Sequence, residues 1–157
     1  MDFKEIVHIL QLGQKKISTM ESCTGGGVAN AITNMEGASE IFEFSAVTYS
    51  NEYKIKMGVP KEIIDKYTVY SMETAVAMSK AITSFANSNY GIGITGKLNK
   101  SDPNNKTGAD NIVYIAIYDH DHDKIYKEKM TVNKESRILN KDHIIEKIIN
   151  MLLNIIK

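Results

Sequence analysis

The sequence predicts a three-layer α/β/α fold with a mixed sheet, contained in a single domain over residues 1–157. Two observations lead to this prediction. Segments with the apolar spacing of helices alternate with short β-branched and aromatic runs. Near the C-terminus two such runs follow one another across a short polar turn, which indicates an antiparallel hairpin beside otherwise parallel strands. A chain of 157 residues is long enough to enclose one real core.

Helices are expected where apolar residues recur every three or four positions. Gly13 ends the first of these segments. Pro60 suits the first residue of a later helix, and Ser71 can cap the one after it. The expected helices cover residues 3–13, 25–33, 51–57, a segment from Pro60, 71–85 and 136–156.

Strands are expected where β-branched and aromatic residues cluster between turn signals. The expected strands cover residues 16–20, 42–50, 90–95, 111–118 and 124–132, with a turn at 119–123. Residues 96–110 are polar and contain Asn, Asp, Pro and Gly, so they are expected to form a long loop. In a compact domain a loop of this length is usually functional.

The composition excludes several classes of protein. Lys and Arg together number 19, as do Asp and Glu, and this zero net charge argues against a general nucleic-acid binder. No apolar run approaches the roughly 18 residues needed to cross a bilayer, and the acidic N-terminus does not resemble a signal peptide. The single cysteine excludes an internal disulfide. We therefore expect a cytoplasmic protein with neither nucleic acid nor membrane as partner.

The run MESCTGGG, at residues 20–27, is the first candidate for chemistry because it joins an expected strand to an expected helix. Ser22 and Cys23 are both potential nucleophiles, and a thiol at a helix start can have a lowered pKa. Unpaired backbone N–H groups from Thr24 to Gly27 suit an oxyanion site or a phosphate cradle. These residues alone do not distinguish an oxyanion site from a phosphate cradle or from a glycine-rich turn used only for packing. They also do not decide whether Ser22 or Cys23 is the nucleophile.

The run TYSNEYK, at residues 48–54, is the second candidate because strand ends expose functional groups in α/β sheets. Lys54 could reach Ser22 if the two strands are neighbours. A desolvated lysine can have its pKa lowered enough to act as a base, as in known Ser–Lys pairs. Tyr49 could relay or donate a proton. The alternative is that Lys54 is an ordinary solvated surface residue.

The run DHDHD, at residues 119–123, alternates the side chains that bind metals. The same residues are common turn formers, and no further ligand cluster accompanies them. We therefore expect no metal site here.

These motifs resemble those of the CinA C-terminal domain family, the nicotinamide-nucleotide amidases. ESCTGG at 21–26 and VTYSNEYK at 47–54 carry the resemblance, which extends over nearly the whole chain, including VYSMETA at 69–75 and GITG at 93–96. It implies hydrolysis of the carboxamide of nicotinamide mononucleotide to nicotinate mononucleotide and ammonia. It also implies that Ser22 is the nucleophile, and that Lys54 and Tyr49 correspond to the lysine and tyrosine of the family motif. We expect Lys54 to act as the base and Tyr49 to help pass a proton to the departing ammonia.

The resemblance implies further features of the site. No metal or organic cofactor is expected, and the chain is expected to form a homodimer or a higher homo-oligomer. The residues expected to hold the oxyanion or to contact the substrate are Thr24, Gly25, Gly26, Thr95, Gly96 and Arg137.

The loop at 96–110 departs from the family, which commonly reads TGIAGP where this chain has TGKLNK. If the loop binds ribose or phosphate, substrate choice has changed, and Lys97 or Lys100 could contact phosphate instead. Two alternatives therefore stand beside the amidase. The chain could be a non-catalytic pyridine-nucleotide sensor or protein-interaction module, or a Ser–Lys amidase for another small amide.

Overall fold

The computed structural model describes residues 1–98, 110–133 and 135–157. Within them five strands form one sheet: β1 (Ile17–Glu21), β2 (Ser45–Val47), β3 (Tyr90–Gly96), β4 (Ile112–Asp119) and β5 (Lys124–Thr131). Their order across the sheet is β2-β1-β3-β4-β5. β1 pairs in parallel with both β2 and β3, whereas β3–β4 and β4–β5 are antiparallel. The expected mixed sheet is thus confirmed, including the C-terminal hairpin.

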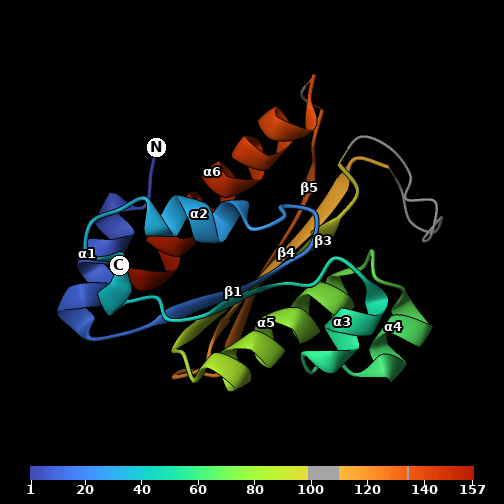
Figure 1. Ribbon diagram of the computed structural model, residues 1–157, viewed down its shortest axis with the longest axis horizontal. Coiled ribbons are helices and arrows are strands. Elements are labelled where there is room, and N and C mark those ends of the chain that lie inside the picture. The colour runs from blue at the N-terminus through green and yellow to red at the C-terminus, as the bar shows by residue number, and fades with distance from the viewer. Residues whose placement is uncertain (99–109, 134) are drawn as a thin grey trace.

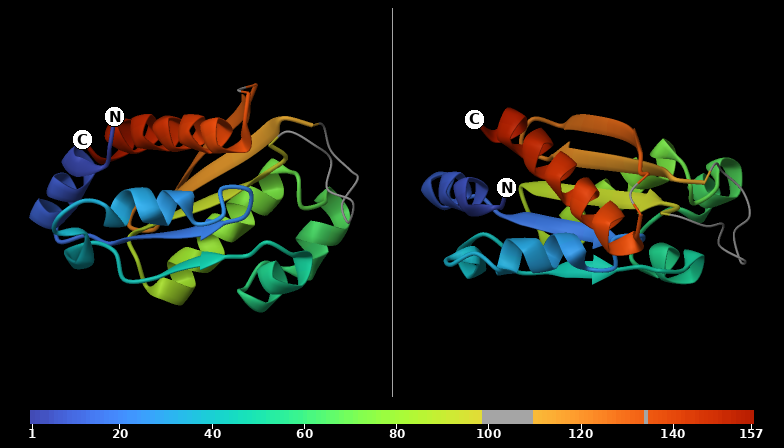
Figure 2. Two further views of the ribbon diagram at one scale, coloured as in Figure 1. Left: turned by 45° about the horizontal axis from the view of Figure 1, so that its top comes forward. Right: turned by 90° about the horizontal axis from the view of Figure 1, so that it is seen from above.

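Helices cover both faces of this sheet, as Figures 1 and 2 show. One face carries α1 (Lys4–Gly13), α2 (Gly27–Thr33) and α6 (Arg137–Ile156), and the opposite side carries α3 (Asn51–Lys56), α4 (Lys61–Tyr67) and α5 (Met72–Ala86). A short 3₁₀ turn, η1 (Ala38–Glu40), follows α2. The predicted three-layer α/β/α architecture is confirmed. No helix in the described part of the chain is both long and apolar enough to cross a bilayer.

Two apolar cores lie on the two faces of the sheet. The larger one packs the sheet against α1, α2 and α6, and it includes Ile92, Ile115 and Ile148 with essentially no exposed surface. The smaller one packs the other face against α4 and α5, around Met20 and Met78. Because both faces are covered, β3 is buried along its whole length.

The approach of α5 to the sheet depends on glycine in β3. A Cβ added to Gly93 would lie 2.2 Å from the Ala75 carbonyl oxygen and 2.7 Å from the Ser79 nitrogen, both on the backbone of α5. Gly91 is equally crowded by Ser79 and Thr83. At its N-terminus α5 is capped as expected, because Ser71 Oγ accepts a hydrogen bond from the Thr74 N–H at 3.1 Å.

The bounds of β2 and α4 differ from the sequence expectations for local reasons. The strand expected over 42–50 is restricted to Ser45–Val47, the stretch that pairs with β1. The aromatic residues before it pack instead of pairing, since the ring of Phe44 lies 5.0 Å from that of Phe85. Pro60 is the N-cap of α4 rather than its first residue, a one-residue shift of the kind common at helix ends.

We predict that Gly93→Ala destabilises the fold by about 1–3 kcal/mol or more, because the added methyl group forces α5 away from β3. Urea unfolding would measure the loss. Gly13→Ala is the matched control, since a Cβ there meets nothing closer than Lys15 Cγ at 3.7 Å. Its stability should be unchanged or slightly raised. Equal stability of the two variants would contradict the close approach.

Candidate active site

Ser22 lies at the carboxyl end of β1, between the ends of the other two parallel strands. Its N–H donates to the Ile94 carbonyl of β3 at 3.0 Å, so strand pairing reaches the serine itself. The chain then turns through Gly25 at φ +60° and Gly26 at φ +95°, in the left-handed region that favours glycine. This is why α2 begins at Gly27 and not at Gly25 as expected. Residues 22–26 are called the nucleophile turn below.

Lys54 projects from α3 toward this turn and is almost fully buried, with 2% of its surface exposed. Its Nζ donates to Ser22 Oγ at 3.1 Å and to the Thr48 carbonyl at 2.7 Å. The helix that carries it begins where Ser50 Oγ accepts the Tyr53 N–H. The alternative of a solvated surface lysine is therefore wrong. A serine hydroxyl and a buried amine in hydrogen-bond contact can serve as nucleophile and base.

Glu21 is a buried residue of the site that the sequence analysis missed. Its carboxylate is fully buried and accepts four hydrogen bonds. They come from Thr24 Oγ1 at 2.6 Å, Thr19 Oγ1 at 3.2 Å, and the N–H groups of Val28 at 3.0 Å and Ala29 at 2.9 Å. The available signal was an acidic residue just before an expected helix start, where the helix dipole favours negative charge.

The amides of the nucleophile turn are not equally available. The Gly25 N–H donates to the Ser22 carbonyl at 2.9 Å, and Glu21 takes the amides at the start of α2. Of the three amides predicted to hold an oxyanion, those of Thr24 and Gly26 make no hydrogen bond among the described residues, whereas that of Gly25 does. Thr24 and Gly26 are therefore the better placed of the three to donate to an oxyanion.

Tyr49 and Arg137 are brought together at the rim of the site. Arg137 Nη2, at the start of α6, donates to the Tyr49 hydroxyl at 3.1 Å. Tyr49 is 62% exposed, and within the described residues its hydroxyl contacts Arg137 rather than Ser22 or Lys54. The two predicted residues therefore contact each other.

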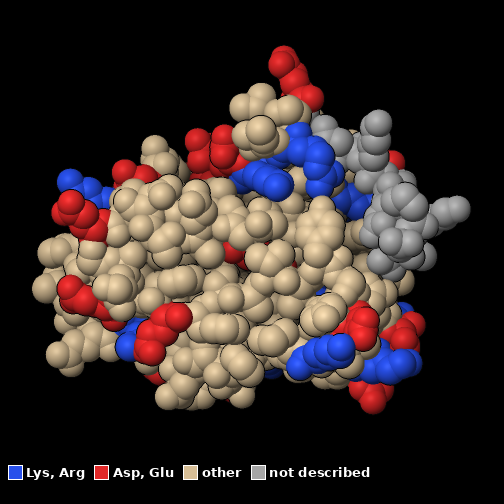
Figure 3. Space-filling view, viewed as in Figure 1, with Lys and Arg blue, Asp and Glu red and all other residues tan. Residues whose placement is uncertain are grey.

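Lys141 is a second cation of α6 beside the nucleophile turn, and the sequence analysis did not single it out. A Cβ added to Gly25 would lie 3.4 Å from Lys141 Nζ. Lys141 follows Arg137 by one helical turn, so both side chains lie on the same side of α6. Figure 3 shows Lys and Arg gathered on this face near the start of α6. The signal in the sequence was this i, i+4 spacing.

Contacts within the protein account for a threonine at position 95 and a glycine at position 96 without a ligand. Thr95 is fully buried, and its Oγ1 donates to the Val69 carbonyl at 2.8 Å. A Cβ on Gly96 would lie 2.5 Å from the Ile112 carbonyl oxygen of β4. Their expected contacts with substrate stay predictions.

Lys97 is buried, and its ammonium group lies near other side chains of the protein. It is 3% exposed, with its Nζ 3.8 Å from Asp110 Oδ1 and 4.9 Å from the centre of the Tyr70 ring. Lys100 and most of the expected loop at 96–110 lie outside the described residues.

Cys23 is buried behind the serine, with 4% of its surface exposed. Burial raises the pKa of its thiol to about 12, although Lys54 and Arg137 oppose the shift. The thiolate is the reactive form of cysteine, so this thiol is inert at neutral pH. The geometry favours Ser22 where local sequence left the choice open.

The hairpin turn at 119–123 lies at the opposite end of the sheet, because Asp119 pairs with Tyr90 while Glu21 pairs with Ile94. Its polar groups bond within the turn and to its neighbours. His122 Nδ1 lies 2.8 Å from Asp119 Oδ2. The described residues contain no group of three or more His, Cys, Asp or Glu able to hold a metal ion.

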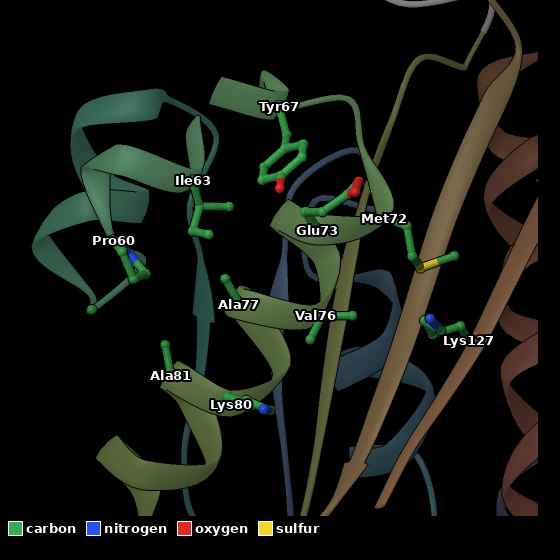
Figure 4. A pocket seen from close by; sticks show the side chains of 11 residues that line it. Pro60, Ile63, Tyr67, Met72, Glu73, Val76, Ala77, Lys80, Ala81 and Lys127 are labelled. Carbon is green, nitrogen blue, oxygen red and sulfur yellow. The ribbon is translucent and has the colours of Figure 1, made fainter. Parts of the chain in front are cut away.

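A groove of about 660 Å³ lies away from the catalytic pair, along α5. Figure 4 shows Ile63 and Tyr67 of α4 on one side of it, with Ala77 of α5 facing them. Its lining includes neither Ser22 nor Lys54.

The fold and site together define a mixed-sheet α/β domain with a buried Ser–Lys pair at the ends of its parallel strands. The family model of the CinA C-terminal domain matches residues 3–156. A CinA-like protein of Kosmotoga olearia is 39% identical over 116 residues, which cover 72% of this chain and 27% of that protein. The chain therefore belongs to the CinA C-terminal domain family.

Solved structures agree with this fold. A competence/damage inducible protein from Agrobacterium tumefaciens has a TM-score of 0.88 at 22% identity, with 98% of this chain and 92% of that chain covered. A competence or damage-inducible protein from Enterobacter asburiae has a TM-score of 0.89 at 21% identity, with 98% and 94% covered. The chain spans only about a quarter of the length of the curated relatives it matches, since it covers 22% of a Clostridium botulinum relative.

We predict that the free energy of unfolding falls between about pH 9 and pH 12 because of Cys23. The unfolded thiol ionises near its ordinary pKa of 9.0, whereas the folded thiol stays protonated up to about 12. The unfolded state therefore releases the proton first, and the stability falls by up to ~1.4 kcal/mol per pH unit. Urea unfolding of the wild type and Cys23→Ala should show a shallower decline in the variant. Parallel declines would contradict the burial of this thiol.

Proposed function

We propose that the protein hydrolyses the carboxamide of nicotinamide mononucleotide to nicotinate mononucleotide and ammonia. The observation that supports this most directly is the 3.1 Å contact of Lys54 Nζ with Ser22 Oγ. A lysine almost fully buried beside a serine is unusual for a structural role, because burying a charged amine is unfavourable. The neutral amine that burial favours is the form able to accept a proton.

In the proposed mechanism, Ser22 Oγ attacks the carboxamide carbon while its proton passes to Lys54. The N–H groups of Thr24 and Gly26, which have no partner among the described residues, are suitable donors to the oxyanion. Collapse of the tetrahedral intermediate returns the proton to the leaving amine, which departs as ammonia, with Tyr49 as a relay. Water then cleaves the acyl-enzyme. No metal or cofactor enters this scheme, and the single cysteine fits action in the reducing cytoplasm.

The phosphate of the substrate is proposed to meet Arg137 and Lys141. Both cations lie on consecutive turns of α6, next to Tyr49 and Gly25 respectively. An Arg fork and a Lys ammonium are both suited to phosphate oxygens. The helix start of α2 is less suited, since Glu21 already occupies its amides.

We predict that Ser22→Ala abolishes ammonia release from nicotinamide mononucleotide. Lys54→Met should lower kcat about 100- to 10,000-fold, because the general base is lost. The assay is ammonia release under saturating substrate, with folding checked by circular dichroism. The exposed residues Ser84 and Lys66 provide matched controls, and Ser84→Ala and Lys66→Met should keep full activity.

Three outcomes would contradict this assignment. Full activity of Ser22→Ala would exclude the serine as nucleophile. Calorimetric binding of the mononucleotide without ammonia release would favour a sensor. Ammonia release from another small amide, but not from the mononucleotide, would place the activity with a different substrate.

We further predict that Arg137→Gln and Lys141→Gln each raise KM for the mononucleotide about tenfold, through loss of a charge-assisted contact. Nicotinamide riboside, which lacks the phosphate, should show no such change. Lys147→Gln is the control on the same helix, where the lysine pairs with Glu128 at 3.0 Å. An equal rise in KM for the riboside would show that these residues do not read the phosphate.

A further inference from the structure

We propose that Glu21 is the positioning residue of this site, which fixes the nucleophile turn so that Ser22 faces Lys54. This inference rests on the proposed amidase function. Glu21 precedes Ser22 directly, and its carboxylate accepts hydrogen bonds from residues before and after the two glycines at 25 and 26. It holds Thr24 within the turn and the amides of Val28 and Ala29 beyond it.

The turn needs such an anchor because its middle is two glycines. Gly25 and Gly26 both have positive φ, and glycine has the greatest conformational freedom in the absence of constraints. The backbone bonds within the turn are short-range: Gly25 N–H to the Ser22 carbonyl, and Gly27 N–H to the Thr24 carbonyl. These two bonds shape the turn, and only its first residue is tied to the sheet by its backbone, through the Ser22 N–H and the Ile94 carbonyl. Beyond Ser22 the link to the sheet is the carboxylate of Glu21, since Glu21 itself pairs with Ile94 of β3 and Val47 of β2.

Glu21 does not compete with Lys54 as the base. Its Oε1 accepts from Thr24 Oγ1 and Val28 N, and its Oε2 accepts from Thr19 Oγ1 and Ala29 N. Four bonds are the full accepting capacity of a carboxylate. Its side chain is also fully buried, so substrate does not reach it. Its effect on the reaction therefore passes through the position of Ser22.

Glutamine at this position cannot replace glutamate. Glutamine has an NH₂ group in place of one carboxylate oxygen. Each oxygen of Glu21 accepts from one threonine hydroxyl and one backbone N–H, and an NH₂ group cannot accept these bonds. Glu21→Gln should therefore lose the hydrogen bonds accepted by one carboxylate oxygen, while the side chain keeps nearly the same volume. The carboxylate also lies at the start of α2, where negative charge is favoured.

The test compares Glu21→Gln with the wild type in two assays. In ammonia release, kcat should fall at least tenfold, KM should change less than threefold, and the shape of the pH profile should be kept. In the second assay a serine-directed fluorophosphonate labels Ser22, followed by intact mass. The labelling rate should fall at least tenfold. Labelling is independent of the natural substrate, so a wild type that labels but releases no ammonia would refute the amidase while leaving the positioning role testable.

The matched controls separate positioning from general stability. Ser18→Ala removes a buried hydroxyl on the same strand, which lies 2.6 Å from Ser88 Oγ. It should lower Tm yet label at the wild-type rate. Thr24→Val removes the hydrogen bond from Thr24 Oγ1 to Glu21 but keeps the bonds of Glu21 with the Val28 and Ala29 amides. Labelling of this variant should slow several-fold. Thr24→Ser keeps the hydroxyl and should label at the wild-type rate.

Two results would overturn the proposal. One is wild-type labelling in both Glu21→Gln and Thr24→Val. The other is equal slowing in Ser18→Ala at a comparable loss of Tm. If Glu21→Gln does not fold, the labelling rates of Thr24→Val and Thr24→Ser decide: wild-type labelling of Thr24→Val then overturns the proposal.

Discussion

The parallel pairing of β1 with two partners at once is the constraint on which the site depends. Because β2 and β3 flank β1 in the same direction, three carboxyl ends meet at one edge of the sheet. The end of β1 supplies Ser22, and the connection after β2 supplies Tyr49 and leads into α3, which carries Lys54. This is the place where open α/β sheets bind ligands. Residues 32 positions apart in the chain thereby come within 3.1 Å.

Two layers of support hold this edge in place. On one side α5 lies close to β3 because Gly91 and Gly93 leave room for its backbone. On the other side the carboxylate of Glu21 joins the end of β1 to the start of α2. Ser22 thus lies between a strand packed closely against α5 and a helix start that is joined to β1 through Glu21.

Much of this was readable in the sequence, because it depended on local patterns. Apolar periodicity predicted the alternation of helices and strands, and the polar turn at 119–123 predicted the hairpin. The approach of Lys54 to Ser22 followed from one assumption, that their strands are neighbours. The short β2 was not foreseen, because the aromatic residues before it favour strands in general, but here Phe44 packs on Phe85 of α5 and Phe42 packs against the larger core.

What stayed hidden were contacts between segments that local sequence does not relate. Lys141 lies beside Gly25 only because α6 crosses the nucleophile turn. Burial of Cys23, which decides against a thiolate, depends on the packing of the whole core. Which amides are already bonded was also hidden: the N–H groups of Gly25 and Gly27 donate to carbonyls within the turn, and Glu21 accepts those of Val28 and Ala29.

The occupation of the α2 amides by Glu21 has a consequence for ionic strength. A phosphate held by buried helix-start amides would be shielded from salt, whereas one held by Arg137 and Lys141 at the rim would not. Exposed charges are screened over about 8–10 Å at physiological salt. Substrate capture would then weaken as salt rises, while the chemical step between the buried Lys54 and Ser22 would not. On the proposed function, the carboxylate of Glu21 would thereby divide the site into a salt-sensitive rim and a salt-insensitive centre.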